Sequence, residues 1–177
     1  MKSSLINCEE GKGGDIMNES GKILFPVDLS EVSPKIAPHV LNFAKRFDAE
    51  IHLLFVVRNL DYLSSVYVPA VSISNLEADI VKGAETKIEE FSGSYFKGYR
   101  ACKTRVVVGD AAEEILKYAE TKKIGLIIIG THGRKGIDRI LFGSVAEKVI
   151  KMSPVPVLSI NPYRVWPAEE EMASSED

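Results

Sequence analysis

The sequence has little of what marks membrane, secreted or metal-binding proteins. No apolar run in its 177 residues approaches the roughly 20 that a helix needs to cross a bilayer. Residues 1–20 are rich in Gly, Ser, Asn and charge, and they lack the apolar core of a signal peptide. The two cysteines, Cys8 and Cys102, stand alone and give neither a metal-ligand spacing nor a disulfide framework. We therefore expect a cytoplasmic protein with free thiols and no membrane partner.

A strong excess of one charge is also missing. The formal net charge is −3, and the segment 162–177 holds five acids and one arginine, so it carries −4 and the rest of the chain +1. A domain with a net charge this close to zero is not expected to have the basic surface that binds nucleic acid, so we expect no nucleic-acid partner. The sequence thus predicts one domain over 21–161, between a flexible leader (1–20) and an acidic C-terminal tail (162–177).

What the sequence does contain is a regular alternation of strand and helix patterns. Short apolar runs predict strands at 22–27, 51–57, 103–108, 126–129 and 155–160. Apolar residues at helical spacing predict helices over 33–47, 75–95 and 144–152, and another that follows the break at Gly109-Asp110. The segment 58–74 has no clear period and contains Pro69, so we expect a long loop there.

Strands that alternate with helices predict a parallel sheet, because parallel strands need crossover connections. Five strands and four helices fit a single-domain, doubly wound, Rossmann-like α/β fold with helices on both faces and the strand order 3-2-1-4-5. The order places 103–108, where charged and apolar residues alternate, at one edge. The other edge is the apolar run from Val155 to Ile160, which predicts a homodimer that pairs through this last strand.

This topology also predicts where a ligand binds. In an open parallel sheet, ligands bind outside the carboxyl ends of the strands, where the winding direction reverses. Here the reversal lies between the first and the fourth strand, so the segment Val27-Asp28 is expected to meet Gly130-Thr131-His132-Gly133.

The second of these segments begins the spacing Gly-x2-Gly-x9-Gly-Ser. Gly130 and Gly133 permit positive φ angles and a close approach of the backbone to a ligand. Gly143-Ser144 stands at the start of a predicted helix, where free N–H groups and the helix dipole favour a phosphate. Ser144 either caps that helix or turns its hydroxyl to a phosphate oxygen. The spacing predicts a phosphate site, with a flexible loop and ordinary capping as the alternative.

Three segments together resemble one known family. KILFPVDLSE, VVVGDAAEEIL and GTHGRKGIDRILFGSVAEKVIKMSPVPVLSI are similar to the universal stress proteins (UspA-like), over about residues 22–160. The glycine spacing is that of the family's ATP-binding branch. The resemblance implies a homodimeric protein of the stress response that binds ATP, with Mg²⁺ or Mn²⁺ held by the phosphates.

The resemblance also assigns roles to individual residues. Those expected to border the adenosine are Pro26, Val27 and Asp28, with Val56 against the base and backbone groups of Val27 facing adenine. Gly130 is expected beside the ribose. Those expected to line or hold the phosphates are His132, Gly133, Arg134, Gly143, Ser144 and Val145. Ala146 stands where ATP binders often carry a hydroxyl, which removes one phosphate hydrogen bond worth ~1 kcal/mol.

Several interpretations stay open at this point. Asp28 either caps the first helix or contacts the nucleotide or its metal. His52 is expected to be structural, and His132 to bind rather than catalyse. There is no Gly-x4-Gly-Lys-Ser/Thr loop and no obvious carboxylate set, so we expect a nucleotide-binding regulator with no catalytic residues and little or no turnover. The alternatives are a slow ATPase or nucleotidyl transferase, and an interaction module of the same family that binds no nucleotide.

Overall fold

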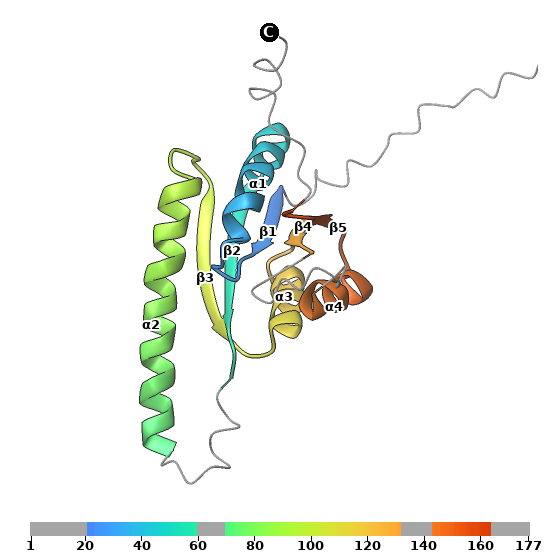
Figure 1. The fold of residues 1–177 in the computed structure, drawn as a ribbon. Helices are drawn as coiled ribbons and strands as arrows, with labels where there is room; N and C mark the ends of the chain where they lie inside the picture. The colour runs from blue at the N-terminus through green and yellow to red at the C-terminus, as the bar shows by residue number, and fades with distance from the viewer. Residues whose placement is uncertain (1–20, 60–69, 132–142, 164–177) are drawn as a thin grey trace, which may run out of the picture.

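The computed structural model describes residues 21–59, 70–131 and 143–163 (Figure 1). Its elements in chain order are β1 (Lys22–Pro26), α1 (Ser33–Phe47), β2 (Glu50–Val57), α2 (Ala70–Tyr95), β3 (Cys102–Val108), α3 (Ala111–Thr121), β4 (Leu126–Gly130), α4 (Ser144–Met152) and β5 (Val157–Ile160). The leader and nearly all of the acidic tail lie outside the described residues. None of the described helices combines the length and the apolar character that a bilayer-spanning helix needs.

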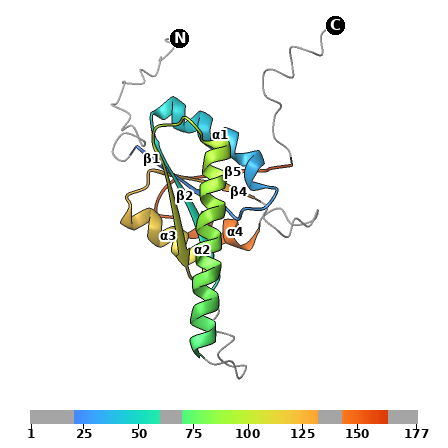
Figure 2. The same ribbon diagram turned by 90° about the vertical axis from the view of Figure 1, so that its left-hand side faces the viewer.

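The strands form one parallel sheet in the order β3-β2-β1-β4-β5, which confirms the predicted topology. Both faces of the sheet are covered by helices, α1 and α2 on one and α3 and α4 on the other (Figures 1 and 2). Successive side chains of a strand point to opposite faces, so Ile23 and Phe25 enter the α1–α2 core while Leu24 enters the α3–α4 core. The continuous apolar runs of β1 and β4 follow from this burial on both faces.

The long helix α2 begins earlier than predicted. Its first residue is Ala70, so the expected loop was wrong over 70–74. Ile73 and Leu76 continue the helical spacing of Ile80 and Ala84, and Pro69 can precede a helix because proline is tolerated in the first turn. The amino half of α2 extends beyond the end of β3 in both views (Figures 1 and 2). Leu76 and Ile80 are therefore 47% and 38% exposed rather than buried against the sheet.

The last strand and the helix before it differ from the prediction at their boundary. β5 begins at Val157, two residues later than expected, after a segment in which Pro154 and Pro156 have no N–H to donate. Met152, the last residue of α4, is 60% exposed although its spacing from Val145 and Val149 predicts that it faces inward. The chain stays in contact with the domain after β5, since the Lys35 Nζ lies 4.7 Å from the ring centroid of Tyr163.

The predicted break before α3 is confirmed, and Asp110 is the N-cap of the helix. The Asp110 side chain accepts a hydrogen bond from the Glu113 N–H at 3.1 Å. Gly109 has a φ of 156°, and a Cβ at this position would lie 2.8 Å from the Cγ of Glu114. This turn therefore requires glycine.

Candidate functional site

The sheet opens between its two central strands at their carboxyl ends. The β1–β4 ladder stops at Leu24↔Ile127, whereas the β1–β2 ladder continues to Pro26↔Leu54 and the β4–β5 ladder to Gly130↔Ile160. Pro26 has no N–H with which to continue a ladder. The opening lies at the predicted switch point of the winding, which is where open α/β sheets bind ligands.

The chain leaves β1 through a tight polar turn on one side of this opening. The Asp28 Oδ1 accepts hydrogen bonds from the Ser30 N–H at 3.0 Å, the Ser30 hydroxyl at 2.7 Å and the Ser33 hydroxyl at 2.9 Å. The N-cap of α1 is Val32, which makes no side-chain cap bond. Asp28 therefore does not cap α1 but organises the turn, and the sequence did not single out its two serine partners.

The same turn contains an unusual backbone conformation. Leu29 has a φ of 56°, in the left-handed region that non-glycine residues rarely adopt. Such a conformation costs about 1 kcal/mol or more and persists where the surrounding structure imposes it. Leu29 packs on the α1–α2 core, which helps to hold it. Strain of this kind gathers at binding sites, so it marks the end of β1 as a candidate.

The start of α4 is attached to the end of β4 on the other side of the opening. Thr131, which follows β4 directly, donates its N–H to the Ile160 carbonyl at 2.9 Å. Its own carbonyl accepts the Gly143 N–H at 2.7 Å. These two bonds place the first turn of α4 beside the carboxyl ends of β4 and β5, whatever path the residues between 131 and 143 take.

That first turn has open hydrogen-bond donors. Gly143 is the N-cap and makes no side-chain cap bond, so Ser144 is the first helical residue and not the cap. The first intrahelical bond is donated by the Glu147 N–H to the Gly143 carbonyl at 2.9 Å. The N–H groups of Ser144, Val145 and Ala146 have no hydrogen-bond partner in the described part of the chain. Ser144 is exposed beside them, so this turn can receive an anion.

The protein's family follows from comparison with known proteins. The family model described as the universal stress protein family matches residues 19–161. The chain belongs to the universal stress protein family. A curated universal stress protein, MJ0531 of Methanocaldococcus jannaschii, is 40% identical over 143 residues, which cover 78% of this chain and 81% of that protein.

Solved structures of universal stress proteins have the same fold. The structure of MJ0577 from M. jannaschii matches with a TM-score of 0.67 and 32% identity, over 80% of this chain and 96% of that one. A universal stress protein in complex with cAMP matches with a TM-score of 0.52 and 19% identity, over 80% of this chain and 96% of that one. The Archaeoglobus fulgidus protein in complex with dAMP matches with a TM-score of 0.50 and 18% identity, over 79% and 97%.

Within this universal stress protein domain, Gly130 does not need the positive φ that was predicted for it and for Gly133, and Gly143 does not have a positive φ either. Gly130 is the last residue of β4 and is not among the described glycines with positive φ. Gly143 has a φ of −68°, and a Cβ there would lie 3.6 Å from the Thr131 carbonyl oxygen, an ordinary contact. A side chain at Gly143 would therefore fit the fold. Gly133, with its neighbours His132 and Arg134, lies outside the described residues.

The residues assigned to the base lie at the strand ends but on different faces of the sheet. The Val27 N–H is already donated to the Leu54 carbonyl at 2.9 Å, so only the carbonyl of Val27 remains for a ligand, contrary to the expectation for both backbone groups. The Val27 side chain is buried in the α1–α2 core. Val56 is half-buried and packs on the α3–α4 core, as does Val145, while Pro26 is half-buried at the end of β1.

The alanine at position 146 does not remove a phosphate hydrogen bond from the site, contrary to the expectation from the sequence. Its side chain is 3% exposed and lies within the α3–α4 core. A hydroxyl at this position would enter the core, so its absence removes nothing from the exposed turn at Ser144. Within residues 21–59, 70–131 and 143–163, no three His, Cys, Asp or Glu side chains come together in a way that could hold a metal ion.

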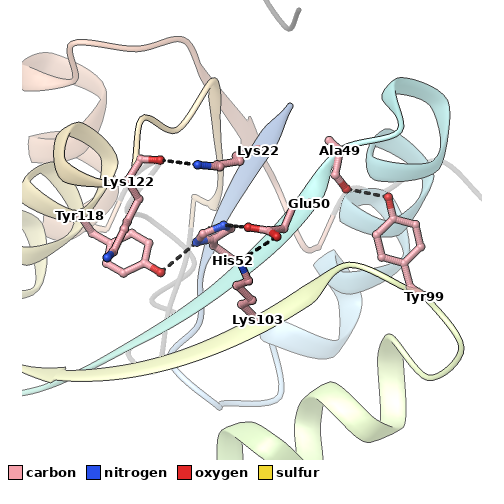
Figure 3. A network of polar contacts seen from close by, with 8 residues as sticks. All are labelled: Lys22, Ala49, Glu50, His52, Tyr99, Lys103, Tyr118 and Lys122. Carbon is pink, nitrogen blue, oxygen red and sulfur yellow. Dashed lines mark hydrogen bonds and ion pairs between the residues drawn. The ribbon is translucent and has the colours of Figure 1, made fainter. Parts of the chain in front are cut away.

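The amino end of the sheet holds a polar network that the sequence did not predict (Figure 3). His52 is 4% exposed and hydrogen-bonds through Nε2 to Glu50 and through Nδ1 to the Tyr118 hydroxyl, at 2.9 Å for the latter. The second Glu50 oxygen pairs with the Lys103 Nζ at 2.9 Å. Burial lowers the pKa of His52, so the ring is neutral, donating to Glu50 and accepting from Tyr118. His52 is thus structural, as predicted, and lies at the end of β2 opposite the opening.

Proposed function

We propose that this universal stress protein binds ATP in the opening between β1 and β4 and acts as a nucleotide-dependent regulator of the stress response, with little or no turnover. The observation that carries the proposal is the first turn of α4. Three N–H groups without a hydrogen-bond partner in the described ranges 21–59, 70–131 and 143–163 are fixed there beside the carboxyl ends of β4 and β5 by the Thr131–Gly143 hydrogen bond. A phosphate is a good ligand for such a turn because it accepts several hydrogen bonds and its charge is favoured by the helix dipole.

In this proposal the phosphates lie on α4. The N–H groups of Ser144 and Val145 and the exposed Ser144 hydroxyl donate to phosphate oxygens, and Gly143 allows a close approach. His132, Gly133 and Arg134 line the rest of the triphosphate. A bound Mg²⁺ or Mn²⁺ is held by the phosphates alone. The Asp28 Oδ1 accepts three local hydrogen bonds, so the carboxylate is committed mainly to the turn.

The adenosine lies toward the ends of β1 and β2. Pro26 and Asp28 border it, the Val27 carbonyl accepts a hydrogen bond from the adenine amino group, and Val56 packs on the base. Gly130, without a side chain, leaves room for the ribose beside β4. The cAMP and dAMP complexes of two proteins with this fold support an adenine nucleotide as the class of ligand.

Calorimetry on the nucleotide-stripped full chain tests this proposal directly. ATP is titrated with and without Mg²⁺, with GTP as the matched ligand that differs only in its base. We expect ATP to bind in the micromolar range and at least about tenfold more tightly than GTP, because the base contacts differ by one or two hydrogen bonds. ATP affinity weaker than millimolar contradicts the proposal and favours an interaction module. Phosphate release well above background favours the slow ATPase.

We further propose a homodimer that pairs through the last strand, now bounded as Val157–Ile160 within the predicted segment from Val155. β5 is an edge strand with one open row of backbone groups. Ile150 and Met152 on the preceding helix are 40% and 60% exposed and add apolar surface near this edge. Light scattering at micromolar concentration is expected to give twice the 19.5 kDa chain mass. A monomeric mass contradicts this proposal and leaves ATP binding untouched.

A further inference from the structure

The opposite edge of the sheet carries a groove that is separate from the nucleotide opening. It has a volume of about 730 Å³ and follows the outer edge of β3, with residues 102–105 and 107 along its floor. One wall is α2, represented by Glu89 and Ser92. The other wall is α3, represented by Lys117, Tyr118 and Thr121, with Lys122 after it. We call this feature the β3-edge groove. β2 lies between it and β1, which borders the proposed ATP site.

The floor of the β3-edge groove offers hydrogen-bonding groups at strand spacing. The Ala101 carbonyl accepts from the Ile51 N–H at 2.7 Å, and the Gly109 N–H donates to the Val57 carbonyl at 2.9 Å. Backbone groups alternate in direction along a strand, so the groups of 103, 105 and 107 also face β2. The N–H and C=O groups of 102, 104, 106 and 108 therefore point outward. They are spaced to pair with one more extended chain.

The α3 side of the β3-edge groove is cationic. Lys103 and Arg105 alternate along β3 on the α3 face, and Lys117 and Lys122 face them from the other wall. Lys103 is paired with Glu50 and Lys117 with Glu114. Arg105 and Lys122 have no carboxylate partner among the residues that the structure describes. This side therefore has two uncompensated positive charges.

The α2 side has the opposite character. The Thr104 hydroxyl donates a hydrogen bond to the Glu89 carboxylate, and the Cys102 sulfur lies 3.5 Å from the Ser92 hydroxyl. The side chains here are small or acidic. An acidic residue of an added strand would meet Glu89 on this side, whereas on the α3 side it would meet Arg105 and Lys122.

From these features we propose that the β3-edge groove binds an extended peptide of a partner protein, one in which acidic residues alternate with small uncharged ones. The peptide pairs with β3 as a sixth strand. Its acidic side chains face Arg105 and Lys122, and its small side chains face Ser92 and Thr104. Charged residues on an edge strand also discourage unwanted pairing. That role does not account for Lys122, which lies on the facing wall and has no carboxylate partner within the described residues.

Fluorescence anisotropy with the full-length chain tests the proposal. The probe is a fluorescein-labelled peptide of sequence Glu-Thr-Glu-Thr-Glu-Thr-Glu, and we expect saturable binding. The double variant Arg105→Gln/Lys122→Gln should weaken it at least about fivefold, because two charge contacts are lost. The matched double variant Arg46→Gln/Lys97→Gln also removes one arginine and one lysine, but from positions outside the β3-edge groove. It should change the affinity for the peptide by less than about twofold. Thermal melts confirm that both variants are folded.

Two further ligands separate strand addition from simple charge attraction. The same peptide with every backbone N–H methylated keeps its charge but cannot complete a ladder, and we expect at least about tenfold weaker binding. Amide signals of residues 102, 104, 106 and 108 should shift only with the unmethylated peptide. No saturable binding, equal binding of the methylated peptide, or equal binding of inorganic polyphosphate through the same two residues overturns the proposal.

Discussion

At the amino end of the sheet, polar side chains bond to one another, whereas at the carboxyl end some backbone donors have no partner among the residues that the structure describes. His52, Glu50, Tyr118 and Lys103 form a connected set, and the Tyr99 hydroxyl donates to the Ala49 carbonyl at 2.6 Å (Figure 3). The same hydroxyl lies 3.0 Å from the Ala44 carbonyl, to which it also donates. Among the described residues no buried side-chain nitrogen or oxygen lacks a hydrogen-bond partner.

The carboxyl end departs from this pattern in three ways. The β1–β4 ladder stops early, Leu29 adopts a left-handed conformation, and three donors in the first turn of α4 have no partner in the part of the chain that the structure describes. The residues at the amino end therefore contribute mainly to stability, and those at the carboxyl end mainly to ligand binding. The comparison yields a rule for substitutions: changes at the amino end should alter the free energy of unfolding, and changes at the carboxyl end should alter nucleotide affinity.

The largest expected effect comes from His52→Ala. The substitution leaves a cavity between β2 and α3 and removes a partner from both Glu50 and Tyr118, so the free energy of unfolding should fall by about 3 kcal/mol. The matched control is His39→Ala, on the half-buried surface of α1, which should cost less than about 1 kcal/mol. Urea denaturation measures both. ATP affinity of the folded His52→Ala protein should stay within about twofold, and a larger loss would break the separation between the two ends.

Acidification should act through the same network. Burial lowers the pKa of His52, so the unfolded chain binds a proton more readily than the native one. The stabilisation that results from this difference in proton binding is fully present above the pKa of the unfolded chain, about 6.5. It is lost as the pH falls toward the lower pKa of the folded protein. Burial alone would raise the pKa of Glu50, but hydrogen bonds from Lys103 and His52 outweigh it and lower the pKa, so a further contribution is lost below about 4.5.

Denaturation midpoints between pH 7.5 and pH 5.5 measure the histidine part of this effect. We expect stability to fall by about 1 kcal/mol over that interval in the wild type and by clearly less in His52→Ala. An identical pH dependence in the two proteins would show that the buried imidazole does not titrate on unfolding as argued.

The smallest effect is expected at the strained turn. Leu29→Gly relieves the left-handed conformation, worth about 1 kcal/mol, but loses the packing of a partly buried side chain and gains entropy in the unfolded chain. These terms oppose each other, so the free energy of unfolding should change by less than about 1 kcal/mol. ATP binding should weaken modestly, since the turn is less rigid. Calorimetry and urea denaturation on the same preparation separate the two results.

The parts of the molecule that were predictable are those with a local or periodic signal. The apolar runs of β1 and β4 and the Asp110 cap lie within short windows. Parallel pairing follows from the alternation of strands and helices, and the charged residues of 103–108 predicted the edge position that β3 has. The start of α2 was not predicted because Pro69 is typical of a loop, although Ile73 and Leu76 continue the helical spacing.

What could not be predicted depends on tertiary contacts. His52 and Tyr118 are 66 residues apart, and only the pairing of β2 with α3 brings them together. The hydrogen bond from the Val27 N–H to the Leu54 carbonyl depends on the register of β1 on β2, which the sequence does not give. Likewise, the sequence suggested that Ala146 replaces a hydroxyl that would bind phosphate, because the spacing does not show which side of a helix end faces the core.

One measurement tests the central claim, that the backbone donors at the start of α4 bind the phosphates. Ser144→Pro removes the hydroxyl and the N–H, yet proline suits the first helical position and Gly143, with a ψ of 149°, has the extended conformation that must precede it. Ala111→Pro is the matched control, because it makes the same change at the first residue of α3 after Asp110, whose ψ is 128°. Ser144→Ala removes the hydroxyl alone.

Calorimetry with ATP should rank the four proteins. We expect Ser144→Ala to weaken ATP binding by about fivefold and Ser144→Pro by about 30-fold or more, since a charge-assisted donor is lost as well. Ala111→Pro should bind like the wild type, and all four should melt within a few degrees of one another. Wild-type affinity in a folded Ser144→Pro protein would contradict the account, because the open turn of α4 would then not be where the nucleotide binds.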